Sequence, residues 1–352
     1  MRHTHSDYMQ WAKTRSRARY NLATSGVGAF SLQDLPFDAS KLEITGENSY
    51  GYPPLVAAIA AQRGVDPDYV VEAAGTSMAN HLALAAILER GDEVLIEHPS
   101  YALIVDAALY LGADVKRFCR TEESGYAIDP AAIRRALTPK TRLIVLTNLH
   151  NPSSTLTSEA VLREVGDLAR SVGALVLVDE VYLDAVYENT PRSAIHLGPE
   201  FVVTGSLTKV YGLSGLRCGW ILARPDLAWK MRRLNDLFAS TPAHPAELLS
   251  VAAFEHLGAI RERARQVVEA DRAVLKKFAP SAPAVGTTFF LRVGDADTFL
   301  ERLRADYETS AVPGRFFEMP EHIRIGMGVN SAMFAEGLRR LVECGTKEGR
   351  WP

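Results

Sequence analysis

One lysine, flanked by two short apolar runs, constrains the fold of this chain more than any other feature. Lys209 lies in a loop rich in serine and glycine that extends from Ser206 to Gly219. Residues 201–204 before the loop and residues 220–223 after it are apolar, which predicts a β-strand on each side. Packing alone explains a lysine in such a loop poorly, so the loop indicates a functional site.

The chemistry of this loop suits one cofactor. Ser206 precedes Lys209 by three residues, and Arg217 follows it by eight. A lysine amine can form a Schiff base with an aldehyde, and a guanidinium binds phosphate oxygens through its planar fork. Pyridoxal 5'-phosphate (PLP) requires both groups, so the loop predicts a site for this cofactor.

The whole loop resembles the PLP-lysine motif of class I/II aminotransferases, the fold-type I enzymes related to aspartate aminotransferase. Residues 206–220 follow the pattern S-x-T-K-x-x-G-L-x-G-L-R-x-G-W, and other family signals occur in the expected order between about residues 45 and 340. The resemblance implies an α/β fold, in which a large domain has a mostly parallel seven-stranded sheet between helices. A smaller α+β domain accompanies it.

Length and composition agree with two domains. The 352 residues are too many for one small core, and 47% hydrophobic with 23% charged residues is ordinary for a globular chain. We expect residues 1–44 to form an N-terminal arm, with a short helix within residues 8–20, and part of the small domain. Residues 45–275 are the predicted large PLP-binding domain, and residues 276–352 the C-terminal small domain.

Charge and cysteine usage exclude several classes of protein. The formal net charge is −3 and basic residues form no tract, which argues against nucleic-acid and anionic-membrane partners. The three cysteines are widely spaced and predict neither a disulfide framework nor a metal site. No apolar run reaches the length of a membrane span, and the N-terminus shows no secretory signal. We therefore expect a cytoplasmic enzyme.

Small residues at the start of a predicted helix provide an anion site. Thr76 and Ser77 directly precede the apolar helix predicted over residues 79–89. Such a turn presents free backbone N–H groups and the positive end of a helix dipole. We expect this turn to hold the cofactor phosphate, together with Ser206 and Arg217.

Four residues that follow predicted strands are expected around the cofactor ring. Asp179 comes directly after the buried strand 174–178, where open α/β sheets bind ligands. The resemblance implies that Asp179 keeps the pyridine nitrogen protonated and that Tyr101 stacks on the ring. It also implies that Asn151 and Tyr182 bond the phenolic oxygen, and that Asn151 adjusts the Schiff-base pKa and contacts the substrate.

Arg324 is the predicted clamp for the substrate α-carboxylate. Residues 312–317 and 322–327 resemble the family pattern V-x-P-G-x-x-F followed by h-I-R-I-x, and Arg324 is the arginine of the second part. A planar guanidinium suits a two-point salt bridge, which lysine does not provide. Arg315 is the alternative residue for this role.

Three positions leave alternatives open. Residues 21–28 either touch the substrate carboxylate through backbone groups, with Gly26 as the candidate, or form a plain connecting loop. Tyr50 resembles the family tyrosine that bonds the partner subunit's cofactor phosphate, with Tyr52 as the alternative, and packing at a turn competes with both. Ser154 replaces the usual glycine of the family motif, so the geometry of that turn is open.

The resemblance implies an aminotransferase that acts as a homodimer with shared active sites. Lys209 would hold PLP as a Schiff base and then act as the base that moves the substrate Cα proton. The amino group would pass from an L-amino acid to a 2-oxo acid. No arginine is identifiable as a clamp for a distal carboxylate, which favours substrates other than aspartate.

Other activities use the same residues. The site also supports β-elimination as in C–S lyases, ring closure as in aminocyclopropane-carboxylate synthases, and oxygen-dependent oxidation of arginine-like substrates. A regulatory domain fused to a DNA-binding module is disfavoured, because the sequence before residue 45 has neither the room nor the pattern for one.

Overall fold

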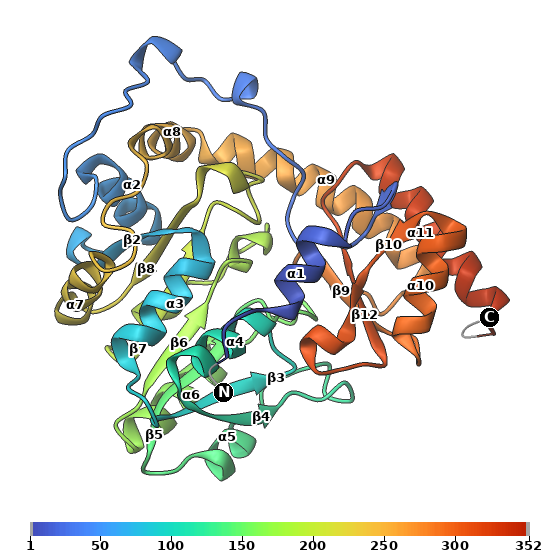
Figure 1. Ribbon diagram of the computed structural model, residues 1–352, viewed down its shortest axis with the longest axis horizontal. Coiled ribbons are helices and arrows are strands. Elements are labelled where there is room, and N and C mark those ends of the chain that lie inside the picture. Colours follow the sequence, from blue (N-terminus) through green and yellow to red (C-terminus); the bar gives the residue numbers. More distant parts are fainter. Residues whose placement is uncertain (1–2, 350–352) are drawn as a thin grey trace.

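A seven-stranded sheet forms the centre of the computed structural model, which describes residues 3–349 (Figure 1). Buried Val, Ile and Leu residues dominate its inner strands, as expected for a sheet covered on both faces. In chain order its strands are β2 (Val70–Ala74), β3 (Glu93–His98), β4 (Asp114–Cys119), β5 (Thr141–Thr147), β6 (Leu175–Asp179), β7 (Phe201–Ser206) and β8 (Cys218–Leu222).

The strand order across the sheet is β2-β8-β7-β6-β5-β3-β4. Strands β3 to β7 are parallel to one another, whereas β8 is antiparallel to both of its neighbours, β7 and β2. The predicted mostly parallel seven-stranded sheet is therefore confirmed. The carboxyl ends of the parallel strands meet at one edge, where α/β sheets bind ligands.

Helices cover both faces of this sheet because successive residues of each strand point to opposite sides. In β6, for example, Val176 and Val178 join one buried cluster and Leu177 joins the other. One face packs against α2 (Pro53–Arg63), α5 (Pro130–Ala136), α6 (Glu159–Ser171) and α8 (His244–Glu255). The other packs against α3 (Gly75–Ile87), α4 (Ala102–Leu111) and α7 (Pro225–Asn235).

A second, smaller unit follows the long helix α9 (Leu257–Phe278), on the right in Figure 1. Its core includes Leu22 of the N-terminal arm, Leu275 of α9 and residues of the last two helices. We propose the domain boundaries near residues 45 and 275 on this basis. The unit contains β9 (Thr288–Arg292), α10 (Ala296–Tyr307), β11 (Val312–Pro313), β12 (His322–Gly326) and α11 (Ser331–Lys347), and β1 (Tyr20–Asn21) pairs with β10 (Thr309–Ser310).

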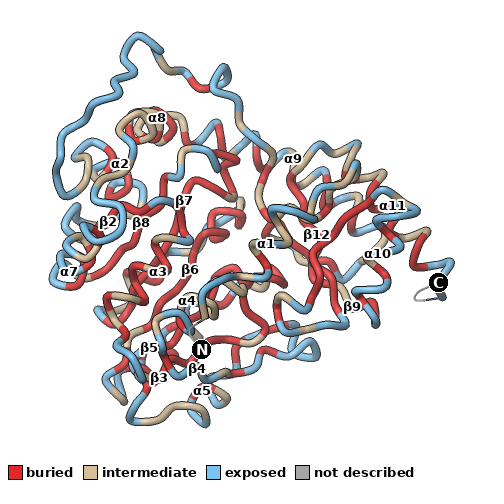
Figure 2. The backbone as a smooth tube through the Cα atoms, in the orientation of Figure 1, coloured by how far each residue is buried: buried red, intermediate tan, exposed pale blue. Residues whose placement is uncertain are grey.

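The N-terminal helix α1 (Asp7–Thr14) lies between the large sheet and the smaller unit (Figure 1). Further along the chain, residues 31–52 are mostly exposed, whereas the central strands are buried (Figure 2). Short 3-10 turns complete the secondary structure at 32–34, 39–41, 67–69, 183–185, 194–196, 214–216 and 314–317. Within residues 3–349, every helix is too short or too polar to cross a bilayer.

Candidate active site

Lys209 lies in the loop that joins β7 to β8, and its side chain faces a cavity of about 270 Å³. Its amine donates a hydrogen bond of 2.9 Å to Ser25 Oγ. The cavity lies at the sheet edge where the parallel strands end. Predicted site residues that line it are Thr76, Ser77, Tyr101, Asn151, Asp179, Tyr182, Lys209 and Arg217.

Three hydroxyls gather beside the cavity, and two of them, those of Thr76 and Thr208, belong to residues that line it. Helix α3 begins at Gly75, so Thr76 and Ser77 lie in its first turn rather than before it. Thr76 Oγ1 donates to Ser206 Oγ over 2.7 Å, and Thr208 Oγ1 lies 2.7 Å from the same oxygen. These hydroxyls and the free N–H groups of the helix start suit a phosphate.

Arg217 lies against the same helix start. Its guanidinium donates to the carbonyl oxygen of Ala74 over 3.1 Å. Gly75 adopts φ +77°, and a Cβ there would lie 2.3 Å from Arg217 Nη2. Glycine adopts this backbone conformation without strain, and its lack of a Cβ lets the guanidinium lie against the helix start. The predicted phosphate residues therefore meet at one place.

Asp179 ends β6 and is the only carboxylate that lines the cavity within the described chain. It accepts hydrogen bonds from Asn80 Nδ2 over 2.8 Å and from the backbone N–H of Val181 over 3.0 Å. Burial raises the pKa of Asp179 to about 6, although these hydrogen bonds and the charge of Lys209 oppose the shift. A cationic group bound beside it would favour the ionised form.

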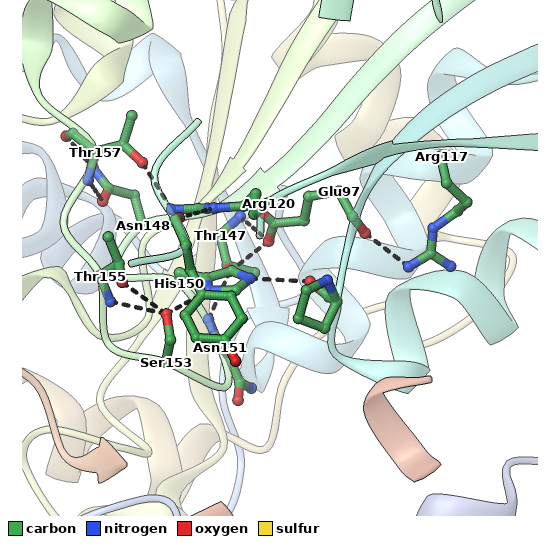
Figure 3. Close-up of polar contacts among 12 residues, drawn as sticks. Glu97, Arg117, Arg120, Thr147, Asn148, His150, Asn151, Ser153, Thr155 and Thr157 are labelled. Carbon is green, nitrogen blue, oxygen red and sulfur yellow. Dashed lines mark hydrogen bonds and ion pairs between the residues drawn. The ribbon is translucent and has the colours of Figure 1, made fainter. Parts of the chain in front are cut away.

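A buried network of polar contacts holds the backbone of Asn151 (Figure 3). The Asn151 N–H donates to Thr147 Oγ1 over 2.9 Å, and that hydroxyl donates to Glu97 Oε1 over 2.6 Å. Glu97 pairs with Arg120 over 2.7 Å, and both side chains are fully buried. Burial raises the pKa of Glu97, but Arg120 and Thr147 favour its ionised form. The network anchors the Asn151 backbone to the sheet.

His150 ties this turn to the segment that carries Tyr101. Its Nδ1 lies 2.6 Å from Ser153 Oγ and its Nε2 lies 3.0 Å from the carbonyl oxygen of Pro99 (Figure 3). Burial and the charge of Arg120 hold the pKa of His150 well below its usual range. A neutral imidazole can donate to the Pro99 carbonyl through Nε2 and accept from the serine through Nδ1.

Arg324 does not line the cavity but contacts two residues that do. Its guanidinium donates to Asn151 Oδ1 over 3.0 Å and to the Tyr8 hydroxyl over 3.3 Å. The residue is fully buried, both contacts are with neutral groups, and its Nε has no hydrogen-bond partner among the described residues. A buried charge paired only with neutral groups is suited to an incoming anion. Arg315, the alternative, is exposed and pairs with Asp297.

Gly26 lies directly against the lysine loop. A Cβ at Gly26 would lie 3.0 Å from the carbonyl oxygen of Lys209, and the N–H of Val27 donates to that oxygen over 2.8 Å. The segment of residues 21–28 thus crosses the loop closely. This contact requires a small residue at position 26, while the substrate contact predicted for Gly26 stays a prediction.

Residues 38–341 match the family model described as aminotransferase class I and II. The chain belongs to this family. Capreomycidine synthase of Streptomyces vinaceus is 29% identical over 356 residues, which cover 95% of this chain and 92% of that protein. A PLP-dependent aminotransferase from Streptococcus suis matches with a TM-score of 0.91 and 25% identity over 99% of both chains.

A third similar protein shows the fold alone. The PLP-dependent cyclase OrfR matches with a TM-score of 0.89 and 23% identity, over 99% of this chain and 98% of its own. Since the class I and II aminotransferase family is PLP-dependent, this chain is a PLP-dependent enzyme of fold type I. The site residues fit that cofactor, because they combine an amine, a group of hydroxyls with an arginine at a helix start, and a buried carboxylate.

Tyr50 and Tyr52 lie outside the cavity of this chain. The Tyr50 hydroxyl donates to Asp236 over 3.0 Å, and its ring meets Trp229 edge-on at 5.0 Å. The ring of Tyr52 lies 5.0 Å from that of His244. A contact between either tyrosine and the cofactor of a partner subunit therefore stays a prediction.

Ser154 adopts the conformation for which this family usually has glycine. Its φ is +63°, in the left-handed region that costs a residue with a side chain about 1–2 kcal/mol. The hydroxyl donates to the carbonyl oxygen of Thr288 over 2.8 Å and accepts from the Thr288 N–H over 3.2 Å. These bonds offset the cost and tie the turn to β9.

Several cavity residues did not emerge from the sequence. Asn80 lies one helical turn after Thr76, and this spacing was a usable signal because it places both side chains on one face of α3. Tyr8 and Ser25 come from the N-terminal arm, whose path no local pattern indicates. Between residues 3 and 349, no three His, Cys, Asp or Glu side chains gather as a metal site would require.

We expect Glu97→Ala to lower the free energy of unfolding by ~3–5 kcal/mol, because it leaves the buried Arg120 without its counter-ion. Urea unfolding of the two proteins measures the difference. Glu159→Ala is the matched control, since it breaks an ion pair with Arg163 of 2.6 Å in which both side chains are half exposed. Its cost should stay below about 1 kcal/mol. An equal loss of unfolding free energy in both variants would show that the buried ion pair stabilises the protein no more than the exposed pair does.

Proposed function

We propose that the chain is a PLP-dependent aminotransferase that moves an amino group from an L-amino acid to a 2-oxo acid. The observation that carries this proposal is the arrangement of Lys209 and Asp179 around one cavity, with the buried Arg324 hydrogen-bonded to Asn151, which also lines it. An amine, a carboxylate and an uncompensated guanidinium match the aldehyde, ring nitrogen and α-carboxylate that the reaction brings together.

The proposed cofactor contacts follow from the chemistry of each side chain. The phosphate would bind Thr76, Ser77, Ser206 and Arg217, which present hydroxyls, N–H groups and a guanidinium. The Asp179 carboxylate would hold a proton on the ring nitrogen, and Asn151 and Tyr182 would donate to the phenolic oxygen. Tyr101 would cover one face of the ring. When bound, PLP supplies an electron-withdrawing ring that stabilises negative charge on the substrate Cα.

The remaining work falls to two residues of the chain. Arg324 orients the substrate by gripping its carboxylate, which fixes the direction of the Cα–H bond. Lys209 Nζ then takes the Cα proton as a general base, a task for which its position in the cavity suits it. The Tyr50 segment would complete a second subunit's site in a homodimer.

A cyclase or lyase is the second candidate. It is favoured by capreomycidine synthase, whose similarity extends over 95% of this chain. The same residues would bind the cofactor and remove the Cα proton, and the outcome would differ only afterwards. Loss of a group from the substrate β-carbon, followed by ring closure, would replace transfer of the amino group.

Titration of the PLP-loaded enzyme with single L-amino acids, without an oxo acid, tests the proposal. An aminotransferase converts the aldehyde form of the cofactor to its pyridoxamine form and releases one equivalent of 2-oxo acid per site. If the aldehyde spectrum returns while a cyclic or eliminated product accumulates, the second candidate is correct. Mass spectrometry of the product decides between the two.

We expect Arg324→Lys to lower kcat/KM for the amino-acid donor by roughly 30-fold or more, which corresponds to about 2 kcal/mol. Lysine keeps the charge but loses the planar fork that meets both carboxylate oxygens. Steady-state kinetics with the best donor measures the change. Arg315→Lys is the control, and an equal loss in that surface variant would remove the argument for Arg324.

A further inference from the structure

Tyr8 is a buried residue in an otherwise mostly accessible helix. It is the one buried residue of α1, with only 8% of its surface accessible. Its ring meets Tyr101 edge-on at 5.5 Å and Phe316 at 5.4 Å. With Met9 and Ala12 it lines one wall of the cavity. Helix α1 therefore covers part of the cavity, and Tyr8 is its buried residue that faces the cavity.

The Tyr8 hydroxyl meets the guanidinium of Arg324. It accepts a hydrogen bond of 3.3 Å from Arg324 Nη2. A phenol that accepts one bond keeps its own proton available as a donor. An anion held by Arg324 would lie beside that O–H group. Burial raises the pKa of Tyr8, but the charges of Arg324 and Lys209 outweigh it and lower the pKa, which makes the phenol a stronger donor.

Contacts on both sides of α1 in the sequence fix the position of this helix. Before α1, His3 Nε2 lies 3.0 Å from Asp106 Oδ1 on α4. After α1, Arg304 Nη2 donates to the carbonyl oxygen of Arg17 over 2.8 Å, and Ser310 Oγ donates to that of Ser16 over 2.7 Å. The segment that carries α1 is thus attached to α4 at its start and to the smaller unit at its end. These two attachments hold Tyr8 at the cavity.

We infer that Tyr8 is a substrate-binding residue, which donates a hydrogen bond to the α-carboxylate that Arg324 grips. The inference rests on the proposed function and adds a second carboxylate ligand, supplied by the N-terminal arm. A hydrogen bond to a charged group contributes a factor of about 10 to 100 in affinity. The contribution should appear only with ligands that carry the carboxylate.

The test compares Tyr8→Phe with the unaltered holoenzyme. Phenylalanine keeps the ring contacts but removes the acceptor of the hydrogen bond from the buried Arg324, so the variant should still unfold cooperatively, at a lower unfolding midpoint. The probe is an α-methyl amino acid, which has no Cα proton and so reports binding through the cofactor spectrum without turnover. The matching amine, which lacks the carboxylate, is the second probe. Tyr69→Phe, outside the cavity, is the control variant.

We expect Tyr8→Phe to lower the affinity for the α-methyl amino acid by about 10- to 100-fold. The affinities for the amine and for PLP should not change. An equal loss of affinity for both probes would show that Tyr8 only lines the cavity, and would overturn the inference. Unchanged affinity for both probes would also overturn it. If the unaltered enzyme responds to neither probe, the proposed function fails, and the inference falls with it.

Discussion

Replacing Lys209 with alanine should slow removal of the substrate Cα proton by at least ~10⁴-fold, because one change removes both the amine that holds the cofactor and the proposed base. No other lysine lines the cavity within the described chain, so no second amine can take over the proton. Exchange of the Cα proton with deuterium, followed by mass spectrometry, measures this step. It does so whether the product is an oxo acid or a ring.

Lys140→Ala is the matched control for this experiment, since that lysine is exposed and lies outside the cavity. It should exchange the proton as fast as the unaltered enzyme. The Lys209 variant should still bind PLP, now without a covalent bond, because the phosphate residues are untouched. A Lys209→Ala enzyme with more than about one-hundredth of the normal exchange rate would contradict the assignment of the base.

Asp179→Asn should lower kcat by ~10²–10³-fold, the range for loss of one fixed electrostatic contact to a reacting group. Asparagine has the same shape but cannot balance a charge on the ring nitrogen. It also breaks one of two contacts, because both partners, Asn80 Nδ2 and the Val181 N–H, are donors and an amide offers only one acceptor atom. Steady-state kinetics and the affinity for PLP measure the two effects.

Glu164→Gln is the control for Asp179→Asn, because it neutralises an exposed carboxylate on α6 without touching the site. It should leave both kcat and PLP affinity unchanged. The assignment of Asp179 would be wrong if its amide variant retained full turnover at saturating cofactor. A loss that disappears when more PLP is added would limit Asp179 to cofactor binding.

The residues that could be predicted from the sequence lie where topology gathers them. Asp179 ends a parallel strand, Asn151 and Lys209 each follow one, and such strand ends meet at one edge of the sheet. Local apolar runs predicted the strands, and the resemblance to the aminotransferase family predicted the role of each residue. The Thr76 turn needed only a shift into the first turn of α3.

The parts that could not be predicted depend on packing between distant segments. Tyr8 reaches Arg324 across 316 positions of sequence, through an arm whose course no periodicity indicates. Glu97 and Arg120 also escaped notice, because two charged residues give no sign that they will be buried together. Tyr50 lies outside the cavity of its own chain, so the cofactor contact predicted for it would require a second subunit and stays a prediction.

Reduction of the PLP-loaded enzyme with borohydride, followed by peptide mapping, tests the central claim most directly. Borohydride converts the bond between an aldehyde and a lysine into a stable one, so the labelled lysine is identified by mass. We predict that the label falls on the peptide containing Lys209 and is absent from the Lys209→Ala variant. A label on another lysine, or none in protein saturated with PLP, would contradict the site described above.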